Sequence, residues 1–169
     1  MSKDLIQQKY IFNEDKNLLS QGAFGQVFKI IDKKVGTEYV LKKLVKTVIG
    51  NKKILGTDEE SFLNEIDFLT KVRGPNIVII IDFYNNPNDN HYFIILEKMD
   101  GDLNEMLNNN INNGKMSSKM IRKIFKQLNS AFKLMIKEKK VHRDLKLSNI
   151  LFTYTNDEKT DFVVKLGDF

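Results

Sequence analysis

The chain has 169 residues, of which 41% are hydrophobic and 29% charged, which suits a folded domain with a sizeable core and excludes a disordered or collagen-like protein. Cysteine is absent and histidine occurs only twice, which excludes disulfides, thiolate or histidine-cluster metal sites and a cysteine nucleophile. The net charge of +5 is spread along the chain, so it favours a solvated basic surface over a dedicated nucleic-acid face.

The first half of the chain reads as strands. Residues 17–20 and 26–31 flank a turn that contains Gly22 and Gly25, and a third strand is predicted over residues 38–44. Glycines between two strands let the backbone approach a ligand and direct its N–H groups at phosphate oxygens. On its own the turn is explained more simply as a two-glycine hairpin.

Helical spacing appears after a loop at residues 48–56. Thr57 and Glu60 have the spacing of a capping box, apolar residues recur with helical period over residues 62–72, and Gly74-Pro75 ends the helix. Two strands are predicted next, over residues 77–83 and 92–96, followed by a short helix over 103–107 and a loop over 108–114. A long helix capped by Ser117 is predicted over 121–135, and a final pair of strands over 149–153 and 162–166.

Two charged residues stand out within apolar patterns. Lys42 lies in the strand Tyr39-Val40-Leu41-Lys42, where a lysine that extends to the surface is the simpler explanation. Glu65 shares the apolar stripe of its helix, although a solvated helix residue is again the simpler explanation. A carboxylate beside apolar positions needs a cation, so we expect Glu65 to pair with Lys42.

The densest group of polar side chains is the segment His142-Arg143-Asp144-Leu145-Lys146-Leu147-Ser148-Asn149, in a loop between a helix and a strand. A structural loop rarely needs so many functional groups flanked by apolar residues. Another carboxylate, Asp168, follows the last predicted strand directly in Gly167-Asp168-Phe169.

Taken in order, the glycine loop, strand lysine, helix glutamate, H-R-D-L-x-x-x-N segment and final Asp-Phe pair resemble the signature set of a eukaryotic protein kinase domain of the serine/threonine type. The resemblance implies a kinase-like α+β fold. It divides the chain into an N-terminal extension (1–11), a β-rich N-lobe (12–98), a hinge (99–102) and the start of a helical C-lobe (103–169). Since the sequence ends at the Asp-Phe pair, the resemblance also implies that the activation segment and the rest of the C-lobe lie outside it, leaving a fragment with an incomplete C-lobe.

The resemblance assigns roles to residues of this chain. Asp144 would orient and deprotonate the substrate hydroxyl, Lys146 would steady the γ-phosphate, and Lys42, paired with Glu65, would bind the α- and β-phosphates. Asn149 and Asp168 would hold two Mg²⁺ ions. The positions implied to contact ATP are Ser20, Gly22, Gly25, Val27, Val40, Lys42, Leu96, Glu97, Met99, Asp102 and Leu151.

Two nucleotide positions depart from the family pattern. Ser20 stands where the first loop glycine is usual, and Val40 stands where alanine is usual. We expect a modest change in ATP affinity from the first and a slightly narrower adenine pocket from the second. Neither departure removes a catalytic group.

The expected function is ATP-dependent phosphorylation of serine or threonine in a protein substrate, with ATP and Mg²⁺ as cofactors. The alternative is a non-catalytic, pseudokinase-like nucleotide-binding module; a nucleic-acid binder has only the positive charge in its favour. No apolar run approaches the roughly 20 residues of a membrane span, and residues 1–4 lack the apolar core of a secretory signal. We therefore expect an intracellular, cytoplasmic protein without a membrane span.

Overall fold

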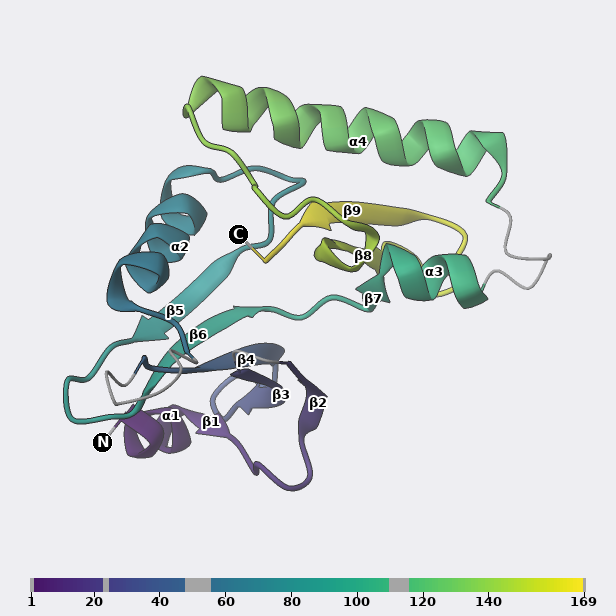
Figure 1. Cartoon of the computed structure of the whole chain (residues 1–169). Coiled ribbons are helices and arrows are strands. Elements are labelled where there is room, and N and C mark those ends of the chain that lie inside the picture. Colours follow the sequence, from purple (N-terminus) through teal and green to yellow (C-terminus); the bar gives the residue numbers. More distant parts are fainter. Residues whose placement is uncertain (1, 23–24, 48–55, 110–115, 169) are drawn as a thin grey trace. The chain divides into compact units, whose positions relative to one another are not determined.

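The structure, a computed structural model, describes residues 2–22, 25–47, 56–109 and 116–168 (Figure 1). The chain divides into two units: Met1–Asp67 with Ile79–Lys98, and Phe68–Val78 with Met99–Phe169. Most of the two predicted loops, at 48–56 and 108–114, lies outside the described residues, as does Phe169 of the Asp-Phe pair. No described helix combines the length and the apolar character needed to cross a bilayer.

A curled antiparallel sheet makes up most of the first unit (Figure 1). Its strands are β1 (Tyr10–Ile11), β2 (Leu18–Gln21), β3 (Gly25–Asp32), β4 (Glu38–Val45), β5 (Ile80–Tyr84) and β6 (His91–Glu97). The order is β1-β3-β4-β6-β5, with β2 also paired to β3. Lys42 therefore lies on an inner strand, opposite Val27 of β3 and Ile94 of β6.

The residues before the first predicted strand pack on this sheet. Helix α1 (Ser2–Lys9) and β1 place Ile6 and Tyr10 in a buried cluster with Phe28, Leu41 and Ile95 of the sheet. The sequence predicted no element here, because Leu5 and Ile6 are the only strongly apolar residues in SKDLIQQK. A helix this short is marginal in water, so its packing against the sheet stabilises it.

The predicted helix after the loop is α2 (Glu59–Lys71). The predicted capping box at its start is wrong: the side chain of Asp58 accepts from the Ser61 N–H at 2.8 Å. The Thr57 backbone N–H is engaged elsewhere, since it donates to the carbonyl of Val45. Along the helix, the Phe62 ring stacks on Tyr92 of β6 at 4.3 Å, which holds α2 to the sheet.

The second unit combines two helices with a small sheet, and α4 lies along β9 (Figure 1). Its elements are β7 (Gly101–Asp102), α3 (Leu103–Asn109), α4 (Ser118–Lys137), a 3-10 turn (Leu147–Asn149), β8 (Ile150–Tyr154) and β9 (Phe162–Leu166), with strand order β7-β8-β9. Ser117 caps α4 as predicted, accepting from the Met120 N–H. Residues 124, 128, 131 and 135 form the buried face of α4 and share a core with β9.

The loop after α2 is fastened within the second unit by the amide of Asn76. This amide donates to the carbonyl of Val164 at 2.8 Å and to Oε1 of Gln127 at 3.1 Å, and so joins the loop to β9 and to α4. The backbone of Asn76 also accepts from the Leu166 N–H at 2.9 Å. Ile77, predicted to begin β5, instead forms a parallel bridge with Leu166, so the strand begins at Ile80.

Candidate active site

The glycine turn is a hairpin between β2 and β3. Ser20 lies opposite Val27, and the Gly22 N–H donates to the carbonyl of Gly25 at 2.9 Å. A side chain at Gly25 would overlap the carbonyl oxygen of Lys43 on β4, whereas one at Gly22 would meet no atom within 4 Å. Packing therefore accounts for the glycine at 25, while Gly22 presents open, exposed backbone.

Lys42 and Glu65 form the expected ion pair in the first unit. The Lys42 Nζ lies 2.7 Å from Glu65 Oε1, and the two side chains are only 18% and 8% exposed. The strand supplies the lysine and the buried stripe of α2 supplies the carboxylate. Such a pair costs desolvation energy, so its presence indicates function more than stability.

The apolar candidates of the first unit share one face of the sheet with Lys42. Val27 lies opposite Lys42, Val40 precedes it by two positions, and Leu96 lies opposite Val40. Side chains two positions apart on a strand, or directly opposite across a pair, lie on the same face. Glu97 has a structural task, since its carboxylate accepts from the Ile79 N–H at 2.7 Å.

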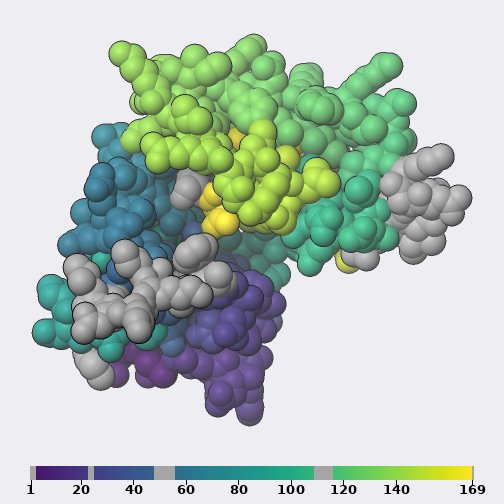
Figure 2. Space-filling model, in the orientation of Figure 1, coloured from purple at the N-terminus to yellow at the C-terminus, as the bar shows by residue number. Residues whose placement is uncertain are grey.

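In the second unit, the segment after α4 gathers two predicted site residues, Lys146 and Asn149, around Asp144. The Lys146 ammonium donates to Asp144 Oδ2 at 2.6 Å, and the Asn149 amide donates to the same oxygen at 3.0 Å and to the Asp144 carbonyl at 2.9 Å. Asp144 and Lys146 are exposed, and their segment, yellow-green in Figure 2, lies on the face shown there. An exposed carboxylate and ammonium therefore meet the amide of a buried asparagine.

The charges in this cluster stabilise each other. The hydrogen bond from Lys146 is the main cause that lowers the pKa of the Asp144 carboxyl, with the Asn149 hydrogen bond and the nearby positive charges acting in the same direction. In return, the carboxylate of Asp144 raises the pKa of the Lys146 ammonium. Asp144 is therefore ionised, and able to accept a proton, throughout the neutral range.

Asp168 is joined to this cluster through the backbone. The Gly167 N–H donates to the carbonyl of Asn149 at 3.0 Å, which brings the start of the Asp-Phe pair beside the catalytic-loop candidate. The buried ring of His142 holds the other side of Gly167, with Nε2 lying 3.0 Å from the Gly167 carbonyl. A carbonyl only accepts, so Nε2 carries the hydrogen. Arg143 and Asp168 both have left-handed backbones, with φ of 68° and 61°.

Asn149 and Asp168 have the donor chemistry of a magnesium site. The nitrogen of the Asn149 amide donates to Asp144, which leaves the amide oxygen as the atom of this side chain that could serve as a metal ligand. Among the residues that the structure describes, no three His, Cys, Asp or Glu side chains form a metal-holding group. One amide and one carboxylate nevertheless fit Mg²⁺, which keeps several waters and binds substrate phosphates alongside few protein ligands.

Of the candidates at and beside the hinge, one has a structural role and the others are half-buried. Asp102 caps α3, because its carboxylate accepts from the Glu105 N–H at 2.9 Å and the Glu105 carboxylate accepts from the Asp102 N–H at 3.2 Å. This capping box was missed in the sequence, where the spacing D-x-x-E was its signal. Leu151 lies opposite Asp102 on β8 and is half-buried, as is Met99.

Residues 13–169 match the family model described as Protein kinase domain. The chain is 32% identical over 162 residues to calcium-dependent protein kinase 4 of Plasmodium falciparum, covering 94% of this chain and 29% of that protein. It is 34% identical over 168 residues to mitogen-activated protein kinase 15 of Xenopus laevis (99% and 26%). It is 32% identical over 164 residues to the serine/threonine-protein kinase stk11 homolog of Dictyostelium discoideum (95% and 25%). The chain thus spans less than a third of the length of these relatives.

Proposed function

Because this chain belongs to the protein kinase domain family, we propose that it binds Mg·ATP and transfers the γ-phosphate to a serine or threonine hydroxyl of a protein substrate. The observation that carries the proposal is the cluster in which Asp144 accepts hydrogen bonds from both Lys146 and Asn149. The buried pair of Lys42 and Glu65 supports it independently. Protein kinases use ATP and Mg²⁺ generally, and the residues described above fit both.

We assign nucleotide binding to the turn and to the face of the sheet that carries Lys42. The missing side chain at Gly22 leaves room for the phosphates to approach the turn, with Ser20 and Gly25 shaping the turn. The Lys42 ammonium balances the charge of the α- and β-phosphates. The adenine would contact the apolar side chains of Val27, Val40, Leu96 and Leu151 and the backbone of Glu97 and Met99. The ribose would contact the carboxylate of Asp102. Since the Asp102 carboxylate already caps α3, its ribose contact is the weakest of these assignments.

The residues of the second unit would carry out the transfer. Asp144 orients the acceptor hydroxyl and takes its proton, while the hydroxyl oxygen forms a bond to the γ-phosphorus and the bond to the bridging oxygen of ADP breaks. Lys146 balances the charge on the transferred group. Asn149 and Asp168 would hold Mg²⁺, which supplies charge neutralisation on the phosphates when bound. No covalent intermediate on the protein is required, in keeping with a chain that has no cysteine.

The substrate class rests on two supports. Lys146 follows the proposed base by two positions, which resembles the serine/threonine pattern. One of the relatives is itself named a serine/threonine-protein kinase. The acceptor is therefore proposed to be an aliphatic hydroxyl in a protein.

Nucleotide binding is tested by calorimetric titration of the 169-residue chain with Mg·ATP. Lys42→Met should weaken binding by roughly tenfold or more, because it removes a charge-assisted contact to the phosphates. The matched control is Lys43→Met, the neighbouring lysine on the same strand, which is ion-paired to Glu14 at 2.9 Å on the opposite face. Equal losses in the two variants would contradict the assignment of Lys42.

Transfer is tested with radiolabelled ATP and casein as a general acceptor, followed by phosphoamino-acid analysis. Asp144→Asn should lower the rate by about 10²–10⁴-fold, the usual range for loss of a general base, with the affinity for Mg·ATP nearly unchanged. Asp157→Asn, in an exposed turn of the same unit, is the control. Binding without transfer in the unaltered chain would instead favour the non-catalytic nucleotide-binding module, and absence of binding would refute both readings.

A further inference from the structure

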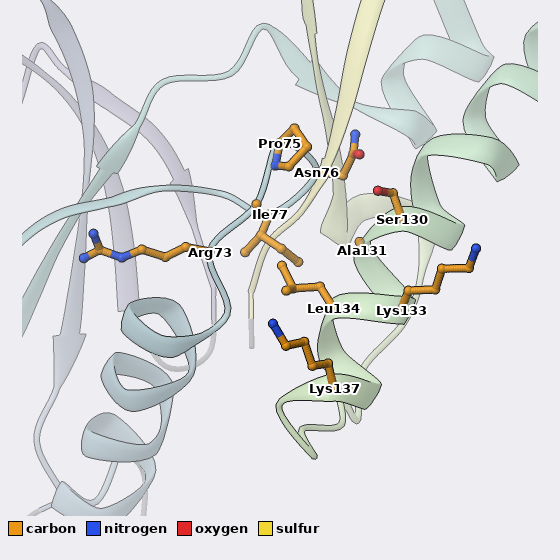
Figure 3. A pocket seen from close by; sticks show the side chains of 10 residues that line it. Arg73, Pro75, Asn76, Ile77, Ser130, Ala131, Lys133, Leu134 and Lys137 are labelled. Carbon is orange, nitrogen blue, oxygen red and sulfur yellow. The ribbon is translucent and has the colours of Figure 1, made fainter.

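A cavity of about 340 Å³ lies in the second unit between the loop at residues 73–77 and the C-terminal half of α4 (Figure 3). Gly74 lets the loop approach the helix closely, since a Cβ there would lie 2.7 Å from a methyl carbon of Leu134. The hydrogen bonds of Asn76 to Val164 and Gln127 hold the loop in place. The loop that forms one wall of the cavity is therefore held in place.

The walls of the cavity are largely apolar. Pro75 and Ile77 face it from the loop, and Ala131 and Leu134 face it from α4 (Figure 3). Small-molecule sites in proteins are concave, mostly apolar and typically about 300–1,000 Å³ in volume, with a few polar groups that orient the ligand. This cavity lies at the lower end of that range and suits a small ligand.

The charge around the cavity is all positive, since no aspartate or glutamate lines it. The side chain of Lys137 extends into the space between helix and loop, whereas those of Arg73 and Lys133 extend away on either side (Figure 3). Within the described part of the chain, the Lys137 ammonium has no hydrogen-bond or ion-pair partner. One unmatched cation therefore points into an apolar cavity.

The carboxyl-terminal end of α4 does not strongly repel a negative ligand in the cavity. A helix C-terminus carries partial negative charge on its last carbonyls. Three of these carbonyls are already hydrogen-bonded by the chain that follows: Leu134 accepts from Glu138, Met135 from Lys140 and Ile136 from Lys139, at 2.9–3.1 Å. Those carbonyls are thus already satisfied, and the formal charges that line the cavity are the cations Arg73, Lys133 and Lys137.

From this geometry we propose a second ligand site: the cavity binds a small organic anion with an apolar body, which contacts Pro75, Ala131 and Leu134 while its carboxylate pairs with Lys137. The site uses none of the residues assigned to ATP or Mg²⁺. Because the loop is held by Asn76 before a ligand arrives, little ordering of the protein is needed on binding.

The test uses 1-naphthoate as the probe and the isotope-labelled 169-residue chain in NMR titrations without nucleotide. Saturable shifts are expected for the amide of Gly74 and the methyl groups of Ala131 and Leu134. The neutral 1-naphthalenemethanol should bind about three- to tenfold more weakly, because it lacks the ion pair with Lys137. Since ATP takes no part, failure here would leave the proposed kinase function untouched.

Two variants make the test specific. Lys137→Gln should abolish the preference for the acid over the alcohol, and Lys126→Gln, an exposed lysine on the same helix outside the cavity, should retain it. Both positions are exposed, so neither change threatens folding. Absence of saturable shifts at the lining residues, equal affinity for the two probes, or an unaltered preference in Lys137→Gln would each overturn the proposal.

Discussion

At the scale of single residues, Asp144 and Lys146 show how a carboxylate is kept ionised without burial. Both side chains are more than half exposed, and their hydrogen bond is 2.6 Å long. The folded pKa of Asp144 lies below its unfolded value, so the stabilisation from this contact is present above the unfolded pKa and is lost as the pH falls through the folded pKa. The acid side of any pH profile is where this contact matters.

Replacing Lys146 by methionine should raise the pKa of Asp144 towards that of an ordinary aspartate, because the main cause of its lowering is removed. The pKa is measured from the carboxyl carbon shift in an NMR pH titration. Lys139→Met, a nearby exposed lysine that does not contact Asp144, serves as the control. An unchanged pKa of Asp144 in Lys146→Met would mean that another group holds the carboxylate ionised.

The sequence predicted a side-chain contact correctly where a charged residue lay within an apolar pattern. Glu65 on a buried stripe required a cation, and the pairing with Lys42 is confirmed at 2.7 Å. The capping role of Asp102 was missed, although its spacing to Glu105 is that of a capping box. Thr57 and Asp58 are adjacent residues that both suit a cap, and the backbone contact of Thr57 with Val45 decides between them. That tertiary contact has no local signal.

At the scale of elements, the two glycines of the β2–β3 hairpin have different structural roles. The close approach of β3 to β4 leaves no room for a side chain at position 25, while position 22 is open. The same motif therefore contains one glycine held by packing and one that leaves backbone accessible.

Gly25→Ala should destabilise the chain by about 1–3 kcal/mol, the usual cost of forcing atoms into a packed region. Gly22→Ala should change the free energy of unfolding by less than about 0.5 kcal/mol, as is usual for open surface positions. Urea unfolding of the two variants gives both values. Equal costs at the two positions would contradict the inference that the packing of β3 on β4 requires the glycine at 25.

Elements with strong periodicity were predicted well, and the weak one was missed. The apolar spacing of α4 and the Ser117 cap were enough to place that helix, which the structure confirms. Helix α1 has no such spacing, and Ile6 is buried only because the sheet lies beside it. Ile77 was predicted to begin the strand at residues 77–83 but forms a bridge with Leu166 instead, because a short apolar run does not reveal where its strand begins.

At the scale of the whole molecule, the two units have separate cores, and contacts between distant parts of the sequence hold each of them. The kinase-like α+β architecture was predictable from the order of motifs along the chain. The fastening of the loop after α2 was not, because its partners on α4 and β9 lie 51 and 88 positions further along.

Asn76→Ala should lower the stability of the second unit by about 2–4 kcal/mol. The change removes two hydrogen bonds and takes away the Asn76 donor from the buried Val164 carbonyl. Gln127→Ala should lower the stability less in the Asn76→Ala background than in the unaltered chain, because the two side chains share a hydrogen bond. Asn129→Ala, exposed on the same helix, should be close to neutral. Denaturant melts of the four variants measure these costs, and simple additivity of the first two changes would contradict a shared network.

The hydrogen bond from Asn76 to Val164 can form only late in synthesis of this part of the chain. Every strand of the first sheet has been made once the ribosome reaches Lys98, so those strands can begin to associate early. The loop at Asn76 has no such opportunity, because its acceptor at Val164 is added 88 residues after it. At about 5–20 residues per second this is a delay of roughly 4–18 s. Through that interval the Asn76 amide has no access to its Val164 acceptor.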